Sequence, residues 1–203
     1  MTNTPRRPGG RSARVRAAVL DAARELLPHG YADVTVERIA ATAGVNKTTI
    51  YRRWFDLEGV LGDLLGEYAR SVVPIPDTGD LDRDLAELAQ LVRQGMTGEP
   101  GDLVTGLAAA APRNERASQI VREFFAERFG LAQAIVERAV ARGDLAEGTD
   151  ARGAIEMLGA PFFFRLLVVR MPIDSTFAKR TAAAAAAALR AGVFSPPLRR
   201  RGK

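Results

Sequence analysis

Residues 35–54 read TVERIAATAGVNKTTIYRRW, the pattern of two short helices joined by a tight turn. Thr35 and Asn46 are suitable N-cap residues, because their side-chain oxygens accept a hydrogen bond from the first turn of a helix. The small side chain of Ala40 lets the two helices approach closely, and Gly44 accepts the left-handed backbone that the turn needs. The stretch therefore predicts a helix-turn-helix, with its second helix ending near Trp54.

This second helix is predicted to have an inner and an outer face. Ile50 and Trp54 lie four residues apart, so both belong to the inner face. The outer side carries or flanks potential hydrogen-bond donors to phosphates and base edges, namely Lys47, Thr48, Thr49, Tyr51, Arg52 and Arg53. An α-helix fills the major groove of DNA, where its N-terminal residues reach the base edges. The pattern predicts that this helix binds double-stranded DNA.

The charge is unevenly distributed along the chain. Residues 1–54 carry ten Arg or Lys against four acidic residues, a balance of +6, whereas residues 55–194 have a balance of −5. A basic first quarter attached to a mildly acidic remainder indicates that one end of the molecule meets a polyanion. Residues 1–11, which include Arg6, Arg7 and Arg11 among prolines and glycines, are predicted to be a flexible basic arm.

Apolar residues recur at helical spacing through nearly the whole chain, and no stretch alternates as a half-buried strand would. The predicted fold is therefore all-α with about nine helices. Residues 12–57 are expected to form a three-helix DNA-binding domain whose first helix is capped by Ser12, and residues 58–194 a larger helical domain. Asp56 is expected to cap a fourth helix, and the remaining helices are placed at about 80–97, 102–111, 114–142, 150–170 and 174–193. Residues 195–203 form a basic tail.

The segment from Arg14 to Tyr68 resembles the DNA-binding domain of the TetR family of transcriptional regulators. The likeness rests on the aromatic Tyr31, the Ile39-Ala40 pair, the Gly44-Val45 turn and the Thr-Ile-Tyr sequence at 49–51, all occurring together. The chain length also agrees with this family, in which a larger helical effector domain follows. The resemblance implies a homodimeric, ligand-responsive regulator, expected to be a repressor that binds a palindromic operator and is released by a small effector.

The resemblance also implies roles for single residues. Thr49, Tyr51 and Arg53 are expected to contact phosphates, with a further phosphate contact from the hydroxyl of Thr35. Lys47, Thr48 and Arg52 are expected to face bases. Many members have a lysine at the start of the fourth helix that contacts the DNA backbone, whereas this chain has FDL at 55–57, so that contact is expected to be missing. The arginines of the arm are expected to compensate by entering an adjacent minor groove.

Two other charged features have simpler interpretations than a contact with DNA. Glu37 is expected to complement the dipole of its helix rather than accept a hydrogen bond from cytosine. The terminal basic run from Arg199 to Lys203 is expected to be a solvated tail rather than a second DNA contact.

Two recognition helices must lie about 34–36 Å apart to bind neighbouring half-sites, which requires a dimer. The last two helices are the predicted interface, because the stretch Ala182–Ala188 offers a smooth surface for close helix packing. The alternative is that this alanine face packs only inside its own subunit.

The middle helices are predicted to hold a small, largely apolar effector, because they contain most of the large apolar side chains. The alternative for each of these residues is ordinary core packing. The candidate lining residues are Met96, Leu103, Leu107, Phe124, Phe125, Phe129, Met157, Phe162 and Phe163.

Other classes of function have little support. The chain has one histidine, His29, and no cysteine, so no catalytic residue, metal site or cofactor is predicted. Asp80, Asp82 and Asp84 lack the glycine and the final glutamate of a calcium loop and are expected to be a solvated helix start. The first residues are not expected to be a signal peptide, and no apolar run approaches the roughly 18 residues of a membrane span, so a cytoplasmic location without membrane contact is expected.

A sequence-nonspecific or architectural DNA-binding protein is the alternative function. Such a protein would carry its positive charge over a wide surface, whereas here the charge is concentrated in the arm, the recognition helix and the tail. The sequence therefore favours a specific regulator.

Overall fold

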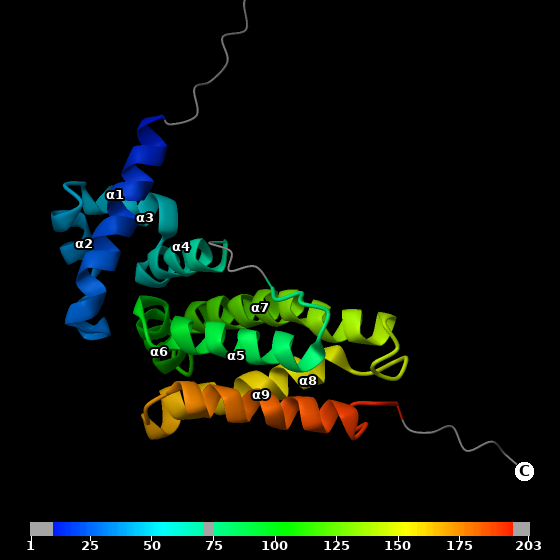
Figure 1. Ribbon diagram of the computed structural model, residues 1–203. Helices are drawn as coiled ribbons and strands as arrows, with labels where there is room; N and C mark the ends of the chain where they lie inside the picture. The colour runs from blue at the N-terminus through cyan, green and yellow to red at the C-terminus, as the bar shows by residue number, and fades with distance from the viewer. Residues whose placement is uncertain (1–9, 71–74, 197–203) are drawn as a thin grey trace, which may run out of the picture.

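The computed structural model describes residues 10–70 and 75–196, and the regular elements in these ranges are all helices or helical turns, as the periodicity predicts. Helices α1–α3 form a group at one end of the molecule, α4 joins this group to the rest, and α5 and α7–α9 lie roughly side by side (Figure 1). The helices are α1 (Arg11–Leu26), α2 (Val36–Thr42), α3 (Lys47–Trp54), α4 (Leu57–Arg70), α5 (Leu81–Met96), α6 (Glu99–Ala110), α7 (Glu115–Ala141), α8 (Ala151–Phe163) and α9 (Ser175–Arg190).

The turn chemistry of the N-terminal group is largely as predicted. Thr35 Oγ1 accepts a hydrogen bond from Arg38 N at 3.2 Å, and Asn46 Oδ1 accepts one from Thr48 N at 2.9 Å. Gly44 has φ +64°, the left-handed conformation expected of the turn. The start of α1 differs from the prediction, because Gly10 and not Ser12 is the N-cap residue. Ser12 therefore lies inside α1, which begins at Arg11.

Helix α4 belongs structurally to both halves of the molecule. Asp56 Oδ1 accepts a hydrogen bond from Gly59 N at 2.8 Å, which is the predicted cap. Val60, Leu61 and Leu64 are fully buried, in a core that α4 shares with α1–α3 and with Leu103 and Leu107 of α6. The expected boundary at 57/58 stays a prediction, since α4 packs on both sides of it.

The later helices follow the predicted order, with two differences. Helix α6 begins at Glu99 rather than near 102, because Pro100 lies in its first turn, where the missing N–H has no intrahelical partner to lose. Helix α8 ends at Phe163 and continues as a π-helical turn, η3 (Phe164–Val169). Pro161 lies inside α8 and cannot donate the usual backbone hydrogen bond, which accounts for the irregular end.

The acidic start of α5 is not entirely solvated. Asp84 is fully buried, and its Oδ1 accepts hydrogen bonds from Thr78 N at 2.7 Å and Thr78 Oγ1 at 2.8 Å. The expectation of a solvated helix start is therefore wrong for this residue. The buried carboxylate fixes the segment that leads into α5.

A second core lies between α5, α7, α8 and α9. Helix α9 packs along α5, and its alanine-rich stretch has two different faces. Ala182, Ala185 and Ala186 are buried inside the subunit, whereas the face formed by Ala183, Ala184 and Ala187 is exposed. The packing inside the subunit thus uses one side of the stretch and leaves the other uncovered.

The arm and the tail fall mostly outside the described residues. Arg6, Arg7 and the Arg199–Lys203 run lie in ranges 1–9 and 197–203, which the structure does not describe. Arg11 is described and begins α1. None of the helices within the described ranges has the length and apolar character needed to span a membrane.

Candidate nucleic-acid interface and effector cavity

Helix α3 is fixed by its inner face. Ile50 is fully buried and Trp54 nearly so, both in the core shared by α1–α4. The Trp54 indole Nε1 donates a hydrogen bond to Asp63 Oδ2 of α4 at 3.0 Å. This bond adds a polar anchor to the apolar contacts, so that α3 is held both in position and in rotation.

The anchor is part of a network that joins α1 and α4. Arg16 of α1 donates to both Asp63 oxygens, from Nε at 2.9 Å and from Nη2 at 2.6 Å, and to Glu67 Oε1 at 2.7 Å. Burial alone would raise the pKa of Asp63, but the hydrogen bonds from Arg16 and Trp54 hold it below its ordinary value. Asp63 is therefore ionised at neutral pH, and its charge is matched by a forked guanidinium.

The outer face of α3 presents the predicted DNA-contact residues to solvent. Lys47, Thr48, Tyr51, Arg52 and Arg53 are exposed, and Thr49 is half-buried. Tyr51 is 43% exposed, a high value for an aromatic side chain on an otherwise well-packed helix. The structure therefore brings all six residues to the side of α3 that is not covered by the subunit.

The N-terminal end of α3 is organised by two neighbouring groups. Asn46 Oδ1 accepts from the Thr48 hydroxyl at 2.8 Å in addition to its cap hydrogen bond, which orients the Thr48 side chain. Lys47 Nζ lies 3.8 Å from Glu37 Oε1, so Glu37 of α2 partly neutralises this lysine in the free protein. Thr35 is half-buried, and its oxygen is engaged in capping α2.

A basic hollow of about 900 Å³ lies between the start of α1 and the α2–α3 turn. Arg11, Arg52 and Arg53 line it together with the hydroxyls of Ser12 and Thr49. Arg53 Nη1 donates to Ser12 Oγ at 2.8 Å, and its guanidinium lies 5.1 Å from the centre of the Trp54 ring. The hollow therefore holds pre-positioned cations and hydroxyls of the kind that bind phosphate.

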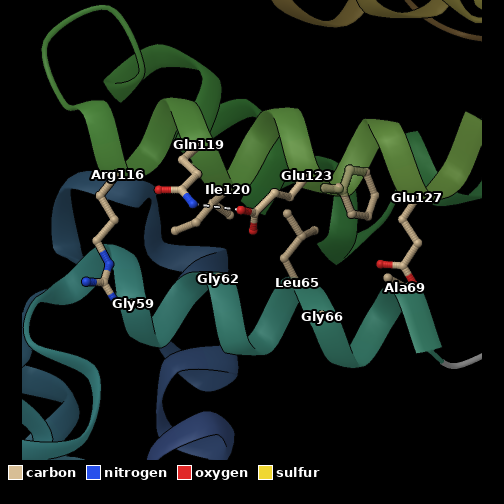
Figure 2. A pocket seen from close by; sticks show the side chains of 11 residues that line it. Gly59, Gly62, Leu65, Gly66, Ala69, Arg116, Gln119, Ile120, Glu123 and Glu127 are labelled. Atoms are coloured by element: carbon tan, nitrogen blue, oxygen red, sulfur yellow. Dashed lines mark hydrogen bonds between the residues drawn. The ribbon is translucent and has the colours of Figure 1, made fainter.

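A contact at the other end of α3 was not predicted from the sequence. Phe55 ends the helix with φ +71° and is 71% exposed, and Arg116 of α7 lies against it with its guanidinium 5.6 Å from the ring centre. Figure 2 shows α4 and α7 side by side, with Arg116 extending toward Gly59 and Ile120 lying over Gly62. A long arginine early in a predicted helix gives no sign of its partner, so no sequence signal identifies this contact.

A largely apolar cavity of about 220 Å³ lies among α4–α8. Five of the predicted effector-pocket residues line it: Met96, Phe124, Phe125, Phe129 and Phe163. The cavity is also bounded by residues that the prediction did not include, among them Tyr68, Gln94, Val104 and Arg128. We call this space the α4–α8 cavity.

The other four predicted pocket residues lie elsewhere. Leu103 and Leu107 are fully buried in the core shared with the DNA-binding helices. Phe162 is fully buried in the second core against Phe177, with ring centres 5.2 Å apart, and Met157 is on the surface. We therefore leave these four out of the effector site that we propose below.

Helix α6 connects the cavity to the DNA-binding helices. Pro100 and Val104 line the cavity, while Gly106 faces the ring of Tyr31 in the turn before α2. A Cβ atom at position 106 would lie 1.8 Å from Tyr31 Cδ2, so the close approach of α6 to this ring requires glycine. One short helix thus contacts both the cavity and the DNA-binding group.

Two family models match this chain. The family model described as "Bacterial regulatory proteins, tetR family" matches residues 19–61, and the model described as "Tetracyclin repressor-like, C-terminal domain" matches residues 75–185, more than half of the chain. The chain belongs to the TetR family of transcriptional regulators.

Individual TetR-family relatives agree along most of their length. The chain is 30% identical to the uncharacterised HTH-type transcriptional regulator YdeS of Bacillus subtilis, over 80% of this chain and 83% of that protein. It is 30% identical to the DNA-binding transcriptional repressor TetR of Mycobacteroides abscessus, over 84% of this chain and 88% of that protein. The crystal structure of the TetR family transcription regulator SCO0332 superposes with a TM-score of 0.69 at 30% identity, covering 84% of this chain and 95% of the other.

Family membership determines the general class of function. The protein is a helix-turn-helix transcriptional regulator and not an enzyme. Regulators of this family bind DNA and small-molecule effectors and act as dimers.

Proposed function

We propose that the protein is a repressor that binds a palindromic operator as a homodimer and is released when a small effector enters the α4–α8 cavity. The observation that carries the proposal is the two-sided character of α3: its inner face is anchored through Ile50 and Trp54, while its outer face presents donors to solvent. A rigid, donor-rich helix is what insertion into a major groove requires. The name of the Mycobacteroides abscessus relative supports repression.

The residues divide into two proposed roles. Lys47, Thr48 and Arg52 face base edges, with the Glu37 ion pair to Lys47 exchanged for DNA on binding. Thr49, Tyr51 and Arg53 bind phosphates, and the basic hollow adds Arg11, which sequence analysis assigned to the arm. The hydroxyl of Thr35 keeps its capping role and adds a phosphate contact from its remaining hydrogen-bonding capacity.

The homodimer is proposed to form through α8, η3 and α9. Several large apolar side chains of these elements are exposed, namely Met157, Phe164, Val168 and Met171, and α9 adds its uncovered alanine face. Such a patch on one subunit is typical of a self-complementary two-fold interface. Replacing Met157 by Asp is expected to shift the protein toward monomer in analytical ultracentrifugation, whereas Leu131→Asp on α7 is the matched control, since Leu131 is also exposed but lies outside the proposed interface.

The effector response is proposed to pass through α6 and through Arg116. An effector seated between Pro100, Val104 and the phenylalanines of α7 would displace α6, whose Gly106 abuts Tyr31. Movement of α7 would likewise change the contact between Arg116 and the end of α3. Either displacement changes the spacing of the two recognition helices, and operator affinity depends on that spacing.

The test begins by selecting bound DNA fragments with the purified protein. A recovered palindromic site is then used in binding assays against scrambled DNA over a range of salt concentrations. Arg52→Ala is expected to cost about 1–3 kcal/mol of discrimination at one base pair, and Tyr51→Phe to weaken all sequences uniformly. Arg83→Ala on α5 serves as the control, because Arg83 is also exposed and its ion-pair partner Glu87 lies on α5 itself. Equal affinity for operator and scrambled DNA would instead favour the nonspecific DNA-binding alternative.

A further inference from the structure

The α4–α8 cavity contains a single charged side chain among the described residues that line it. Arg128 lies on α7 at helical spacing from Phe124, Phe125 and Ala132, which face the same space. The remaining lining residues are apolar apart from Tyr68 and Gln94. A cation is therefore placed in an environment that is otherwise suited to hydrocarbon.

Arg128 differs from the other arginines of its helix in having no counter-charge. No hydrogen bond or ion pair joins Arg128 to any other residue in the part of the chain that the structure describes. The remaining arginines of α7 and its C-cap are each paired, Arg116 with Asp56, Arg122 with Glu115, Arg138 with Asp77 and Arg142 with Asp144. The half-buried guanidinium of Arg128 is thus the exception on a helix whose arginines otherwise have acidic partners.

A half-buried cation beside an apolar cavity is poorly solvated, and an anion brought into the cavity would recover that loss. Tyr68 cannot supply the anion, because burial raises its pKa to about 12 and keeps the phenol neutral. Gln94 carries no charge. None of the described residues that line the cavity therefore supplies an anion, and a ligand that carries one would be matched by Arg128.

The walls of the cavity restrict the rest of that molecule. Phe125 is in edge contact with Phe163, with ring centres 4.4 Å apart, and lies 5.6 Å from Phe129 in a stacked arrangement. Such a cluster accepts a flat ring or a short alkyl chain between its faces. The volume of about 220 Å³ is below the range of about 300–1,000 Å³ that is usual for drug-sized ligands. The occupant is compact.

We propose that the effector is a small organic carboxylate with an aromatic or short alkyl body, whose carboxylate pairs with the guanidinium of Arg128. This inference rests on the proposed effector site and specifies the chemical class that the site takes. A planar guanidinium binds a carboxylate through two parallel hydrogen bonds, which fixes orientation as well as charge.

The experiment compares matched pairs of probes on the full-length protein. Benzoate, cinnamate and octanoate are each titrated by calorimetry beside benzamide, cinnamamide and octanamide, which have nearly the same shape and no charge. At least one carboxylate is expected to bind about ten-fold or more tightly than its amide, the usual scale of a charge-assisted hydrogen bond. Arg128→Met is expected to abolish this preference while leaving amide affinity nearly unchanged, which also shows that the variant is folded.

Two further variants make the result specific. Arg122→Met removes an exposed arginine from the same helix and is expected to leave the preference intact. Arg128→Lys is expected to retain part of it, because an ammonium keeps the charge but lacks the forked geometry. The inference is overturned if none of the three carboxylates binds more tightly than its amide, or if the preference survives in Arg128→Met.

Operator binding is measured separately with the same probes. If the amides release the operator as well as the carboxylates do, the proposed effector response stands and the role of Arg128 falls. If a carboxylate binds through Arg128 without any change in operator affinity, the assignment of ligand class stands and the proposed effector response falls.

Discussion

Arg116 Nη2 donates a hydrogen bond to the carbonyl oxygen of Trp54 at 3.0 Å, so the first turn of α7 is bonded directly to the last turn of the recognition helix. The same guanidinium is 3.2 Å from Asp56 Oδ1, which keeps it at the junction of α3 and α4. Carbonyls at the end of a helix have no intrahelical partner, and a cation there also complements the helix dipole. One side chain from the effector half therefore completes the end of the DNA-binding helix.

Replacing Arg116 by Ala is expected to weaken operator binding several-fold with only a small loss of stability, because the side chain is half-exposed but contacts the end of α3. Fluorescence anisotropy with an operator fragment measures the first effect and thermal unfolding the second. Arg122→Ala is the control, since its partners among the described residues, Ser118 and Glu115, lie on α7 itself. Unchanged operator affinity in Arg116→Ala would show that the contact does not position the recognition helix.

Gly106→Ala and Gly130→Ala are expected to have opposite effects on stability. A methyl group at 106 would overlap the Tyr31 ring and force it to move, which typically costs about 1–3 kcal/mol. At 130, in the middle of α7, nothing lies within 4 Å of the added Cβ atom, so the helix is expected to gain about 0.5–1 kcal/mol. Chemical denaturation of the two variants checks both signs, and a stable Gly106→Ala protein would mean that α6 and Tyr31 are not tightly packed.

Tyr31→Phe is expected to stabilise the protein. The Tyr31 hydroxyl is buried and has no hydrogen-bond partner among the described residues, and burial raises the pKa of this phenol to about 12. Removing an unsatisfied buried hydroxyl is expected to raise the free energy of unfolding by about 1 kcal/mol, because the group no longer has to be dehydrated. The melting temperature provides the measurement. A loss of stability would reveal a partner for the hydroxyl, such as an ordered water.

Asp63→Asn is expected to destabilise the protein by about 1–3 kcal/mol at neutral pH, since the fork of Arg16 and the indole of Trp54 lose their charged acceptor. The pKa of Asp63 is lower in the folded than in the unfolded protein, so its contribution is present above about pH 4 and is lost as the pH falls through the folded-state value. Unfolding free energies measured across this range should therefore converge for the two proteins on acidification. Asp21→Asn, on an exposed pair with Arg24, should show a much smaller difference.

Local signals predicted local structure well. Thr35, Asn46 and Asp56 each act on a backbone N–H two or three residues away, so their capping roles are encoded within a single turn. Ser12 has the same chemistry and was predicted as a cap, but Gly10 begins the helix two residues earlier. Its hydroxyl instead accepts from Arg53, forty-one residues away in the sequence. This partner lies on another helix, so the sequence around Ser12 does not indicate it.

Contacts between different helices could not be predicted from the local sequence in the way that the capping residues were. Phe125 and Phe162 are both large and apolar, yet one lines the α4–α8 cavity and the other is sealed in the second core. The choice depends on how α7 and α8 are rotated against each other, and no single-helix pattern specifies that rotation. The same holds for Arg116 and Arg128, since nothing in the sequence around either arginine shows that one has acidic and carbonyl partners and the other none.

The two faces of the alanine-rich stretch of α9 differ in how freely their residues can be substituted during evolution. Ala182, Ala185 and Ala186 are constrained by the neighbouring helix of the same subunit, where any larger side chain would meet atoms already in place. Ala183, Ala184 and Ala187 are exposed, so a larger side chain there would extend into solvent within one subunit. In the dimer interface that we propose, single substitutions on this outer row can change which copies of the chain pair with each other, while the inner row preserves the fold.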